Sequence, residues 1–470
     1  MRSTVRWAEE EFGGADLGDR RRTRRLVAMA AEVATRPAGT VTRACGSSAA
    51  REGAFRLLEN DAVRPEAILR SAQEAAARRC EGRRNVFVAV DGTSLHITDT
   101  TGRKEVGSIG SRDRGARGLQ VMTALVVDDQ GSPVGIGGQA MWARRARSRR
   151  DPKGRRPKAG GENVYWQVVL EDCSRTFADV APQTTPWYQL DRGADCWQVL
   201  TYAKEAELVL TVRAVHDRRL DDRVERLWRA VEDAPVVATK WIDVPARGPV
   251  RRGCRRAGMR THLVLAAREA RRAKVAIHAA TVPLLVSTPT GTQTLEFNAV
   301  LVREVKRAKQ PVTWLLLTTH SVQSHQAALE VVRGYTFRWR IEDFHRAWKR
   351  GLCRVEDTQL RSRNAITKWA TLLAAVATRA MRLTQQARAT PDAPASDEFT
   401  VVELEALIAL RQPKGLTHRA PTLGEAVRWL ADLGGYTGPW NGPPGATVVG
   451  RGLNDMLVAA RAFENQKKKR

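Results

Sequence analysis

The first 80 residues carry apolar side chains at three- and four-residue spacing, which is the period of an amphipathic helix. Two segments show it most clearly, DRRRTRRLVAMAAEVA (19–34) and SSAAREGAFRLLEN (47–60). In the second segment, Ser47 or Ser48 stands where an N-cap residue is expected. The pattern predicts a small, basic helical module over residues 1–80.

The period changes near residue 85, where NVFVAVDGTSLHIT (85–98) is an apolar run rich in strand-forming residues. The segment LQVMTALVVDDQGSPVGIGGQAMW (119–142) predicts two strands joined by a Gly/Pro turn. A helix at 163–181 and strands at 185–190 and 206–214 follow. This alternation predicts an α/β core, whose first part we place at 81–213.

Residues 214–310 contain several short β-like stretches and no convincing helical period, which predicts a β-rich insertion. A strand at 312–319 and two helices, the second over 335–349, return to the pattern of the core. With the apolar helix that follows, they make a second part of the core at 311–385.

The segment 386–470 is predicted to be a helical C-terminal domain after a linker rich in Pro, Ala and acids. We do not expect so short a module to bury its last apolar stripe by itself. That stripe consists of Leu453, Met456, Leu457, Ala460 and Phe463.

The chain is strongly basic. It has 78 Lys and Arg residues and 51 Asp and Glu residues, which gives a net charge of +27. The cations come in runs at 19–25, 144–158, 251–256 and the C-terminus. Such density predicts a polyanionic partner, above all nucleic acid, whose counterion release favours binding. For any single run, a solvated loop or tail is the alternative.

Other features argue against membrane and secretory classes. The chain has no apolar signal core and no stretch approaching the roughly 18 apolar residues of a membrane span. Its six cysteines form no CxxC pair and have no histidine at zinc-ligand spacing, so neither structural zinc nor a disulfide framework is expected. We therefore expect a soluble protein of a reducing cytosol with no membrane partner.

Three acids are candidates for chemistry: Asp91 in an apolar strand, Asp191 just past another strand, and Glu342 on a helix. A buried carboxylate without a partner costs several kcal/mol, so each needs one. Each also has a structural alternative: Asp91 could begin a turn, Asp191 could cap the next helix, and Glu342 could pair with a neighbouring arginine. Together, carboxylates from two strands and a helix suit two Mg²⁺ ions that promote in-line phosphoryl transfer.

The segment YTFRWRIEDFHRAWK (335–349) adds cations to this group. On one continuous helix, Tyr335, Arg338, Glu342 and Lys349 fall within a sector about 60° wide. We therefore expect Glu342 to bind metal, with Arg338, Lys349 and the Tyr335 hydroxyl holding the phosphates delivered to it.

These residues also carry a family resemblance. YTFRWRIEDFHRAWK resembles the Tyr-(2)-Arg-(3)-Glu-(6)-Lys motif of the insertion-sequence-four (Tn-five-like) bacterial DDE transposases. DRGAD (191–195) is similar to their second acidic motif and VDGTSL (90–95) to their first. The likeness runs in order along nearly the whole chain, from WAEEEFGGADLGDRRRTRRLV near its start to LADLGGY near its end.

The resemblance implies a ribonuclease-H-like catalytic core with a β-strand insertion. It also implies an N-terminal domain that reads transposon ends and a C-terminal helical dimerisation domain. Asp91, Asp191 and Glu342 would be the metal-binding triad for Mg²⁺, with Mn²⁺ as an alternative ion. The protein would act as a homodimer on double-stranded DNA, both transposon ends and target, in the bacterial cytosol at the nucleoid.

Carried over in the same way, Tyr335, Arg338 and Lys349 would contact phosphates. Trp314, which lies 28 residues before Glu342, would stack on a base flipped out as a DNA hairpin forms; its alternative role is that of a core residue. We also expect DNA-end binding by the N-terminal cations Arg20, Arg21 and Arg24.

The predicted function is therefore a cut-and-paste DNA transposase that nicks, forms a hairpin, excises the element and joins it to target DNA. Two alternatives stay open: a ribonuclease-H-like nuclease that cuts without joining, and a non-catalytic DNA-binding repressor of transposition. The chain departs from the family at 117–120, where RGLQ stands in place of RGWW, and it matches poorly at 144–158 and 385–450.

Overall fold

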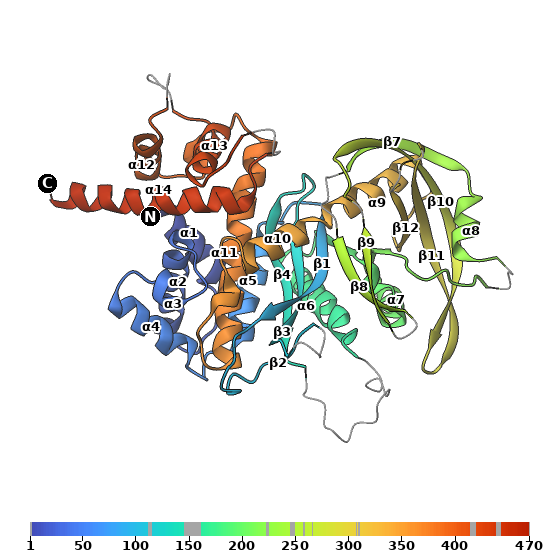
Figure 1. Ribbon diagram of the computed structural model, residues 1–470, viewed down its shortest axis with the longest axis horizontal. Helices are drawn as coiled ribbons and strands as arrows, with labels where there is room; N and C mark the ends of the chain where they lie inside the picture. The colour runs from blue at the N-terminus through green and yellow to red at the C-terminus, as the bar shows by residue number, and fades with distance from the viewer. Residues whose placement is uncertain are drawn as a thin grey trace. The chain divides into compact units, whose positions relative to one another are not determined.

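The computed structural model divides the chain into two compact units of mixed α/β structure (Figure 1). Unit 1 comprises Met1–Tyr188 and Phe337–Arg470, and unit 2 comprises Gln189–Thr336. The boundaries fall inside a strand, β5 (Thr185–Leu190), and inside the last turn of a helix, α9 (His325–Phe337). The structure describes residues 2–110, 115–144, 161–221, 225–244, 250–256, 259–265, 267–306, 308, 311–413, 420–438 and 443–469. The predicted basic loop at 144–158 lies outside these residues after Arg144.

Unit 1 begins with the predicted helical module. Two of its helices start at side-chain caps: the Asp19 carboxylate accepts from the Arg21 N–H, and the Ser47 hydroxyl accepts from the Ala50 N–H. The prediction of helices over 19–34 and 47–60 is confirmed. The helices are α1 (Arg2–Phe12), α2 (Arg20–Thr35), α3 (Val41–Ala44), α4 (Ser48–Leu58) and α5 (Pro65–Arg78).

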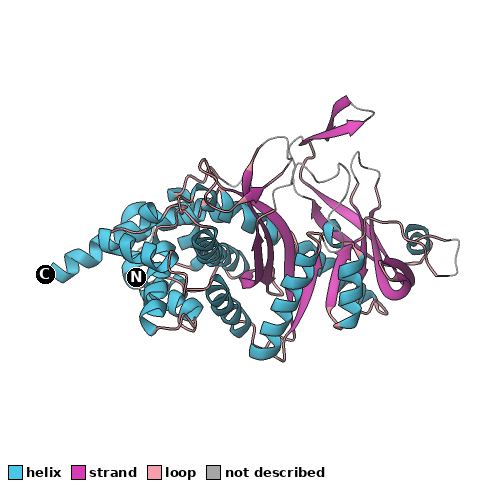
Figure 2. Cartoon of the chain, turned by 90° about the horizontal axis from the view of Figure 1, so that it is seen from below, coloured by secondary structure: helices cyan, strands magenta, loops and turns pink. Residues whose placement is uncertain are grey.

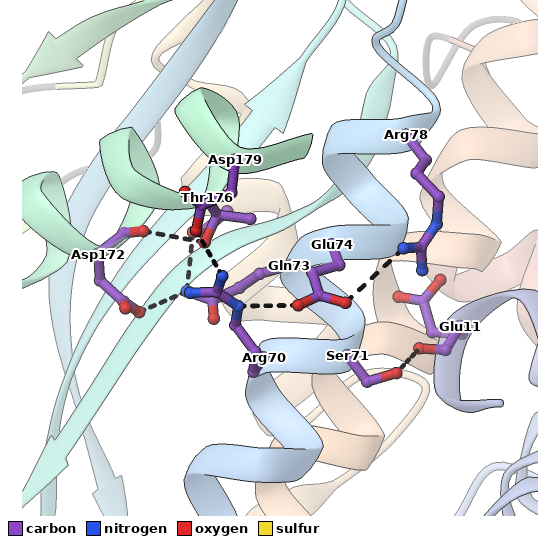
Figure 3. A network of polar contacts seen from close by, with 10 residues as sticks. Glu11, Arg70, Ser71, Gln73, Glu74, Arg78, Asp172, Thr176 and Asp179 are labelled. Carbon is purple, nitrogen blue, oxygen red and sulfur yellow. Dashed lines mark hydrogen bonds and ion pairs between the residues drawn. The ribbon is translucent and has the colours of Figure 1, made fainter. Parts of the chain in front are cut away.

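A polar network ties α5 to the helices on either side of it (Figure 3). The Ser71 hydroxyl donates to the Glu11 carbonyl at the end of α1, over 2.9 Å. Arg70 donates to Glu74 on its own helix and to Asp179 on α6 (Val164–Val180), at 2.9 and 2.8 Å. Burial raises the pKa of Glu11, while the paired Arg79 opposes that shift. These contacts fix the N-terminal helices to the sheet region of unit 1.

The sheet of unit 1 has the strand order β2-β3-β1-β5, with β4 also paired to β3. Strand β1 pairs antiparallel with β3, and Asp91 stands opposite Thr123. Residues 86–90 of β1 are buried, as the continuous apolar run predicts for an inner strand. The remaining strands are β1 (Asn85–His96), β2 (Gly107–Ser108), β3 (Arg117–Val127) and β4 (Pro133–Trp142).

Helices cover this sheet. Helices α5, α6 and α11 (Arg363–Ala389) pack on β4, while α10 (Arg340–Lys349) packs on β1 and β3. The Ser362 hydroxyl caps α11 by accepting from the Ala365 N–H. Because α10 contacts β1 directly, side chains of the two elements are brought together in unit 1.

The C-terminal helices pack on one another and on α11 and α2, and both views show the two ends of the chain in one helical region (Figure 2). Two helices begin with capping boxes, Thr400 with Glu403 and Thr422 with Glu425. The last apolar stripe is buried, but the C-terminal module does not bury it alone, as expected. Leu453, Met456, Leu457 and Ala460 are buried on α14, which packs on α12 and α13 and also on α11 and α2. The helices are α12 (Val401–Arg411), α13 (Leu423–Leu433) and α14 (Ala446–Lys469).

Unit 2 is built on an antiparallel sheet of order β6-β12-β11-β10-β7. Its longest pair, β10 and β11, forms a hairpin in which Thr288 faces Gly291. Helix α7 (Trp197–Glu205) packs on β10, and β8 with β9 forms a separate two-stranded sheet. The strands are β6 (Val209–Arg213), β7 (Val236–Val244), β8 (Val250–Arg256), β9 (Met259–Leu265), β10 (Arg271–Thr288), β11 (Gly291–Glu304) and β12 (Thr313–Thr318).

The sequence pattern of 214–310 did not reveal one short helix. The segment is rich in strands, but it also contains α8 (Leu227–Glu232), which packs on β10 and β11. Leu227 and Val231 point to the same side of this helix and are fully buried. A helix of six residues with only two buried positions is too short to establish a helical period in the sequence.

The structure confirms the mixed α/β class with helical flanks. The five-part domain division stays a prediction. Within the described residues, no helix contains a stretch long and apolar enough to span a bilayer.

Candidate active site

Strand β1 presents Asp91 immediately after its buried segment. The carboxylate accepts from the neighbouring Gly92 N–H at 2.7 Å, and the side chain keeps 17% of its surface exposed. The backbone of β1 therefore fixes the position of Asp91, and the carboxylate remains partly accessible.

Helix α10 presents Glu342 in its first turn. The helix is anchored by Ile341, Phe344 and Trp348, all buried, and the Trp348 indole N–H donates to the Ala370 carbonyl of α11 at 3.0 Å. The Glu342 side chain lies away from this buried face and is 37% exposed. The apolar residues therefore orient the helix so that its carboxylate is available.

Arg338 brings these two acids into one cluster. Its Nη1 lies 3.6 Å from Oδ2 of Asp91 and its Nη2 lies 3.6 Å from Oε1 of Glu342, both ion-pair separations. Arg338 itself is only 13% exposed. The alternative pairing of Glu342 with Arg338 is thus observed, whereas Arg346 pairs with Asp343 instead.

The expectation of one continuous helix over 335–349 is wrong. Helix α9 ends at Phe337 and α10 begins at Arg340, with i to i+3 bonds from the Ile341 and Glu342 N–H groups at the junction. Packing explains the break: Phe337 contacts Phe87 of β1 at 5.4 Å between ring centroids, while α10 buries a different set of apolar residues. Tyr335 consequently belongs to unit 2, and Arg338, Glu342 and Lys349 belong to unit 1.

Lys349 contacts β1 two residues beyond Asp91. Its ammonium donates to the Thr93 hydroxyl at 3.1 Å and lies 3.6 Å from the carboxylate of Glu356. Burial lowers the pKa of Lys349, and Glu356 opposes that shift. Glu356 also accepts from the His96 N–H at 2.9 Å and from Arg350 at 2.8 Å. Sequence reasoning missed Glu356, because its role depends on contacts with β1 that no local pattern reveals.

Asp191 follows β5 and belongs to unit 2. Its carboxylate accepts from the Gly193 N–H at 2.7 Å and so caps the short helix Arg192–Ala194, the structural alternative considered for it. The second acid of DRGAD is different. Asp195 has a fully buried side chain that accepts from the Val215 and His216 N–H groups at 2.6 and 3.0 Å and pairs with Arg218 at 2.5 Å. Of the two acids, only Asp191 is partly exposed to solvent.

Trp314 and Tyr335 lie together in unit 2, with ring centroids 5.5 Å apart in an edge-on arrangement. Trp314, on β12, stands opposite Val302 of β11 and is half-buried, while Tyr335 is buried. An indole that retains exposed surface is compatible both with stacking on a base and with packing, the two roles considered for it.

The N-terminal cations Arg20, Arg21 and Arg24 are exposed at the start of α2. Arg21 makes an exposed ion pair with Asp19 at 3.5 Å. An exposed pair of this kind contributes little stability, so these cations are available to an external anion.

The donor chemistry of Asp91 and Glu342 fits a hard divalent ion, which prefers carboxylate oxygen. Asp91, Glu342 and Arg338 together carry a net charge of −1, so the cluster attracts a further cation. Within neither unit do the described residues group three or more His, Cys, Asp or Glu side chains closely enough to bind a metal ion. Cys45, Cys80, Cys173, Cys196 and Cys353 are free thiols. Burial raises the pKa of Cys80 to about 12, which keeps that thiol protonated.

Comparison with known families gives two matches. Residues 4–63 match a family described as transposase DNA-binding, and residues 211–379 match a family described as transposase DDE domain. The first range contains Arg20, Arg21 and Arg24. The second contains Trp314 and the whole segment 335–349, whereas Asp91 and Asp191 lie outside both ranges. The chain joins a transposase DNA-binding domain to a transposase DDE domain and is therefore a DDE transposase, an enzyme class that cuts and transfers DNA with divalent metal ions.

Proposed function

We propose that this chain is a cut-and-paste transposase of the insertion-sequence-four (Tn-five-like) family that acts on double-stranded DNA. The observation that carries the proposal is the cluster in unit 1. There, Asp91 and Glu342 both face Arg338 at 3.6 Å, and Lys349 is fixed to β1 two residues further along.

We further propose Asp91, Asp191 and Glu342 as the ligands of two Mg²⁺ ions, which Mn²⁺ could replace. Such ions activate the attacking oxygen and stabilise the leaving oxygen of an in-line displacement at phosphorus. The accessible carboxylates of all three residues support this choice, as does the neighbour Asp195, whose carboxylate is buried and paired with Arg218.

Arg338 and Lys349 then act on the phosphate. Arg338 can present two parallel N–H donors to phosphate oxygens, while Lys349 supplies a point charge that burial and Thr93 hold in place. The Tyr335 hydroxyl adds a third contact in this proposal. Trp314 stacks on the base that leaves the helix, an interaction worth about 1 to 3 kcal/mol.

Four displacements follow in order. Water attacks the phosphorus at the element's end, and the 3′ oxygen leaves and takes up a proton. That 3′-hydroxyl attacks the phosphorus on the opposite strand, so that the hairpin bond forms as the 3′ oxygen of the flanking DNA leaves and takes up a proton. Water then attacks the hairpin phosphorus, and the element's 3′-hydroxyl is freed again. Finally, the freed 3′-hydroxyl attacks target DNA, so that one phosphodiester bond forms as another breaks. A homodimer would hold two ends at once.

Joining of a pre-cleaved end to a plasmid tests the proposal. The proposed enzyme produces covalently joined molecules when Mg²⁺ is supplied. A nuclease would degrade or nick the same DNA without joining, and a repressor would bind it unchanged. Either of these two results would overturn the proposed function.

A further inference from the structure

A buried polar row crosses the sheet of unit 1 beside Asp91. In the register of β1, β3 and β4, Asp91 stands opposite Thr123, and Thr123 stands opposite Gln139. Residues directly opposite each other on antiparallel strands point to the same face, with Cβ atoms about 4.5 to 5.5 Å apart. The three side chains therefore share one face of the sheet. Thr123 is fully buried and Gln139 is 7% exposed, whereas the Asp91 side chain is 17% exposed.

Helix α10 covers this face. Its Lys349 donates to the hydroxyl of Thr93, which lies two residues beyond Asp91 and so points to the same side of β1. The polar row is thus enclosed between the sheet and the helix that bears Glu342. Whatever the row does, it does next to the candidate active site.

The hydrogen bonds of the row have a direction. Nε2 of Gln139 donates to Oγ1 of Thr123 at 3.1 Å, so one lone pair of that hydroxyl is occupied and its own proton is left to donate. Because Thr123 has no exposed surface, that proton needs a buried acceptor. The carboxylate of Asp91 is the strong acceptor across the strands, and its accepted bond from the Gly92 N–H leaves further lone pairs for a hydroxyl and a cation.

Stability does not explain the row. Oε1 of Gln139 is buried and makes no hydrogen bond with any residue that the structure describes. A buried amide oxygen without a partner destabilises a fold, whereas apolar side chains of similar shape in place of both Thr123 and Gln139 can be neutral or stabilising. Polar groups that break this rule concentrate at functional sites.

We propose that Thr123 and Gln139 are positioning residues for a divalent metal ion at Asp91. Gln139 orients the Thr123 hydroxyl, and that hydroxyl donates to the Asp91 carboxylate and fixes the oxygen that faces the ion. The inference rests on the proposed function, since it takes Asp91 as a metal ligand. Partners that hydrogen-bond to a ligating side chain hold it in one orientation, and their loss weakens metal affinity or activity by about 10- to 100-fold.

The other face of the same sheet provides a matched control pair. Oγ of Ser94 donates to Oε1 of Gln120 at 2.9 Å, and Nε2 of Gln120 is buried without a hydrogen-bond partner among the described residues. Ser94 is three residues beyond Asp91, an odd number, so it points to the opposite side of β1. This hydroxyl–amide pair reproduces the chemistry of Thr123 and Gln139 across the sheet from the Asp91 carboxylate.

Binding of Mn²⁺ to the full chain, measured by calorimetry, tests the positioning role. The double variant Thr123→Val with Gln139→Leu should melt close to the wild-type temperature but bind Mn²⁺ about 10- to 100-fold more weakly. Thr123→Ser keeps a hydroxyl and should keep the affinity. The control double variant, Ser94→Ala with Gln120→Leu, should bind Mn²⁺ as the wild type does.

The Mg²⁺ dependence of plasmid cleavage gives a second measurement. The Thr123 and Gln139 double variant should need about 10- to 100-fold more Mg²⁺ for its half-maximal rate. At saturating Mg²⁺ its rate should approach that of the wild type, because the reacting groups are all present. A lower maximal rate with an unchanged Mg²⁺ requirement would overturn the positioning role.

Three results of the calorimetry would also overturn it. They are wild-type Mn²⁺ affinity in the Thr123 and Gln139 double variant, an equal loss in the control pair, and a loss in Thr123→Ser as large as that in the double variant. Weaker binding in a double variant that melts early would indicate a structural role instead.

The two proposals fail separately. Normal joining of a pre-cleaved end, with wild-type Mn²⁺ affinity in the double variant, removes the positioning role alone. Weaker Mn²⁺ binding by the double variant, with no joining by the wild type, removes the transposition mechanism alone. Unchanged Mn²⁺ affinity in Asp91→Asn would remove Asp91 from the metal ligands and the positioning role with it.

Discussion

At the scale of single residues, the two acids of DRGAD show how burial separates a structural carboxylate from an available one. Asp195 satisfies two backbone N–H groups and Arg218 inside unit 2, whereas Asp191 makes one cap interaction and keeps an accessible side. The motif alone does not distinguish the two acids.

Asp195→Ala should therefore destabilise the protein by about 3 to 5 kcal/mol, because it leaves the Arg218 charge buried without its partner. Asp191→Ala should cost only about 1 kcal/mol, the worth of a cap. Denaturant unfolding of both variants measures the difference. Equal losses, or a larger loss at Asp191, would show that the structural role has been given to the wrong acid.

His345 provides a prediction of pH dependence. Burial, with Lys349 and Arg338 adding to it, lowers the pKa of His345 to about 3. The unfolded chain binds a proton below the ordinary value of 6.5, and the folded chain does not. The contribution of neutral His345 to the free energy of unfolding is therefore fully present above pH 6.5 and is lost as the pH falls toward 3.

By pH 5, the loss from His345 should reach about 2 kcal/mol, at about 1.36 kcal/mol per pH unit. His345→Gln removes this titration, so the variant should lose about 2 kcal/mol less than the wild type between about pH 7.5 and pH 5. Urea unfolding at the two pH values measures this. Parallel loss in both proteins would mean that His345 titrates normally in the folded state.

At the scale of elements, the first turn of α2 concentrates exposed cations at a helix N-terminus, where the helix dipole adds to their field. We expect this turn to bind DNA phosphates. Arg20, Arg21 and Arg24 changed together to Ala should weaken end binding and reduce the salt slope by about one for each phosphate that is no longer neutralised. Filter binding over a salt series measures it, and a wild-type slope would place the phosphate-binding cations on another element.

Strand β12 and helix α9 bring Trp314 against Tyr335, and the consequence of removing the indole depends on its role. If Trp314 stacks on a flipped base, Trp314→Ala should nick DNA at nearly the normal rate and accumulate nicked intermediate, because hairpin closure slows. Trp314→Phe should recover part of the loss.

A time course of nicked, hairpinned and released DNA, run beside a thermal melt, distinguishes the two roles of Trp314. Removal of a core residue would leave a cavity and destabilise the fold by several kcal/mol. In that case nicking and hairpin formation would fail together in a protein that melts early, and the base-stacking role would be abandoned.

The same elements show where sequence patterns suffice. The run 86–90 predicts β1 correctly, since an inner strand is apolar on both faces. The cap at Ser47 is a local hydrogen bond, so local sequence identifies it. The break after Phe337 could not be predicted in this way, because packing against Phe87, 250 residues earlier, decides it. Glu356 was missed for the same reason.

At the scale of the whole chain, distant segments build unit 1, which unites residues 1–188 with 337–470. Asp91 and Glu342 are brought together only because α10 returns to β1 after the intervening unit. The C-terminal stripe is buried by its own chain, so the proposed homodimer must use another surface. A sequence pattern reports that a face is apolar and does not report what covers it.

The central claim is that Asp91, Asp191 and Glu342 together perform the chemistry. Cleavage and binding of the same end-bearing DNA should be measured for Asp91→Asn, Asp191→Asn and Glu342→Gln, with Asp343→Asn as a control that changes the same charge beside Glu342. Each of the first three should abolish cleavage and leave binding close to wild type, because phosphate contacts position DNA independently of the metal ligands. The control should cleave. Cleavage that survives in any one of the three variants would contradict the triad.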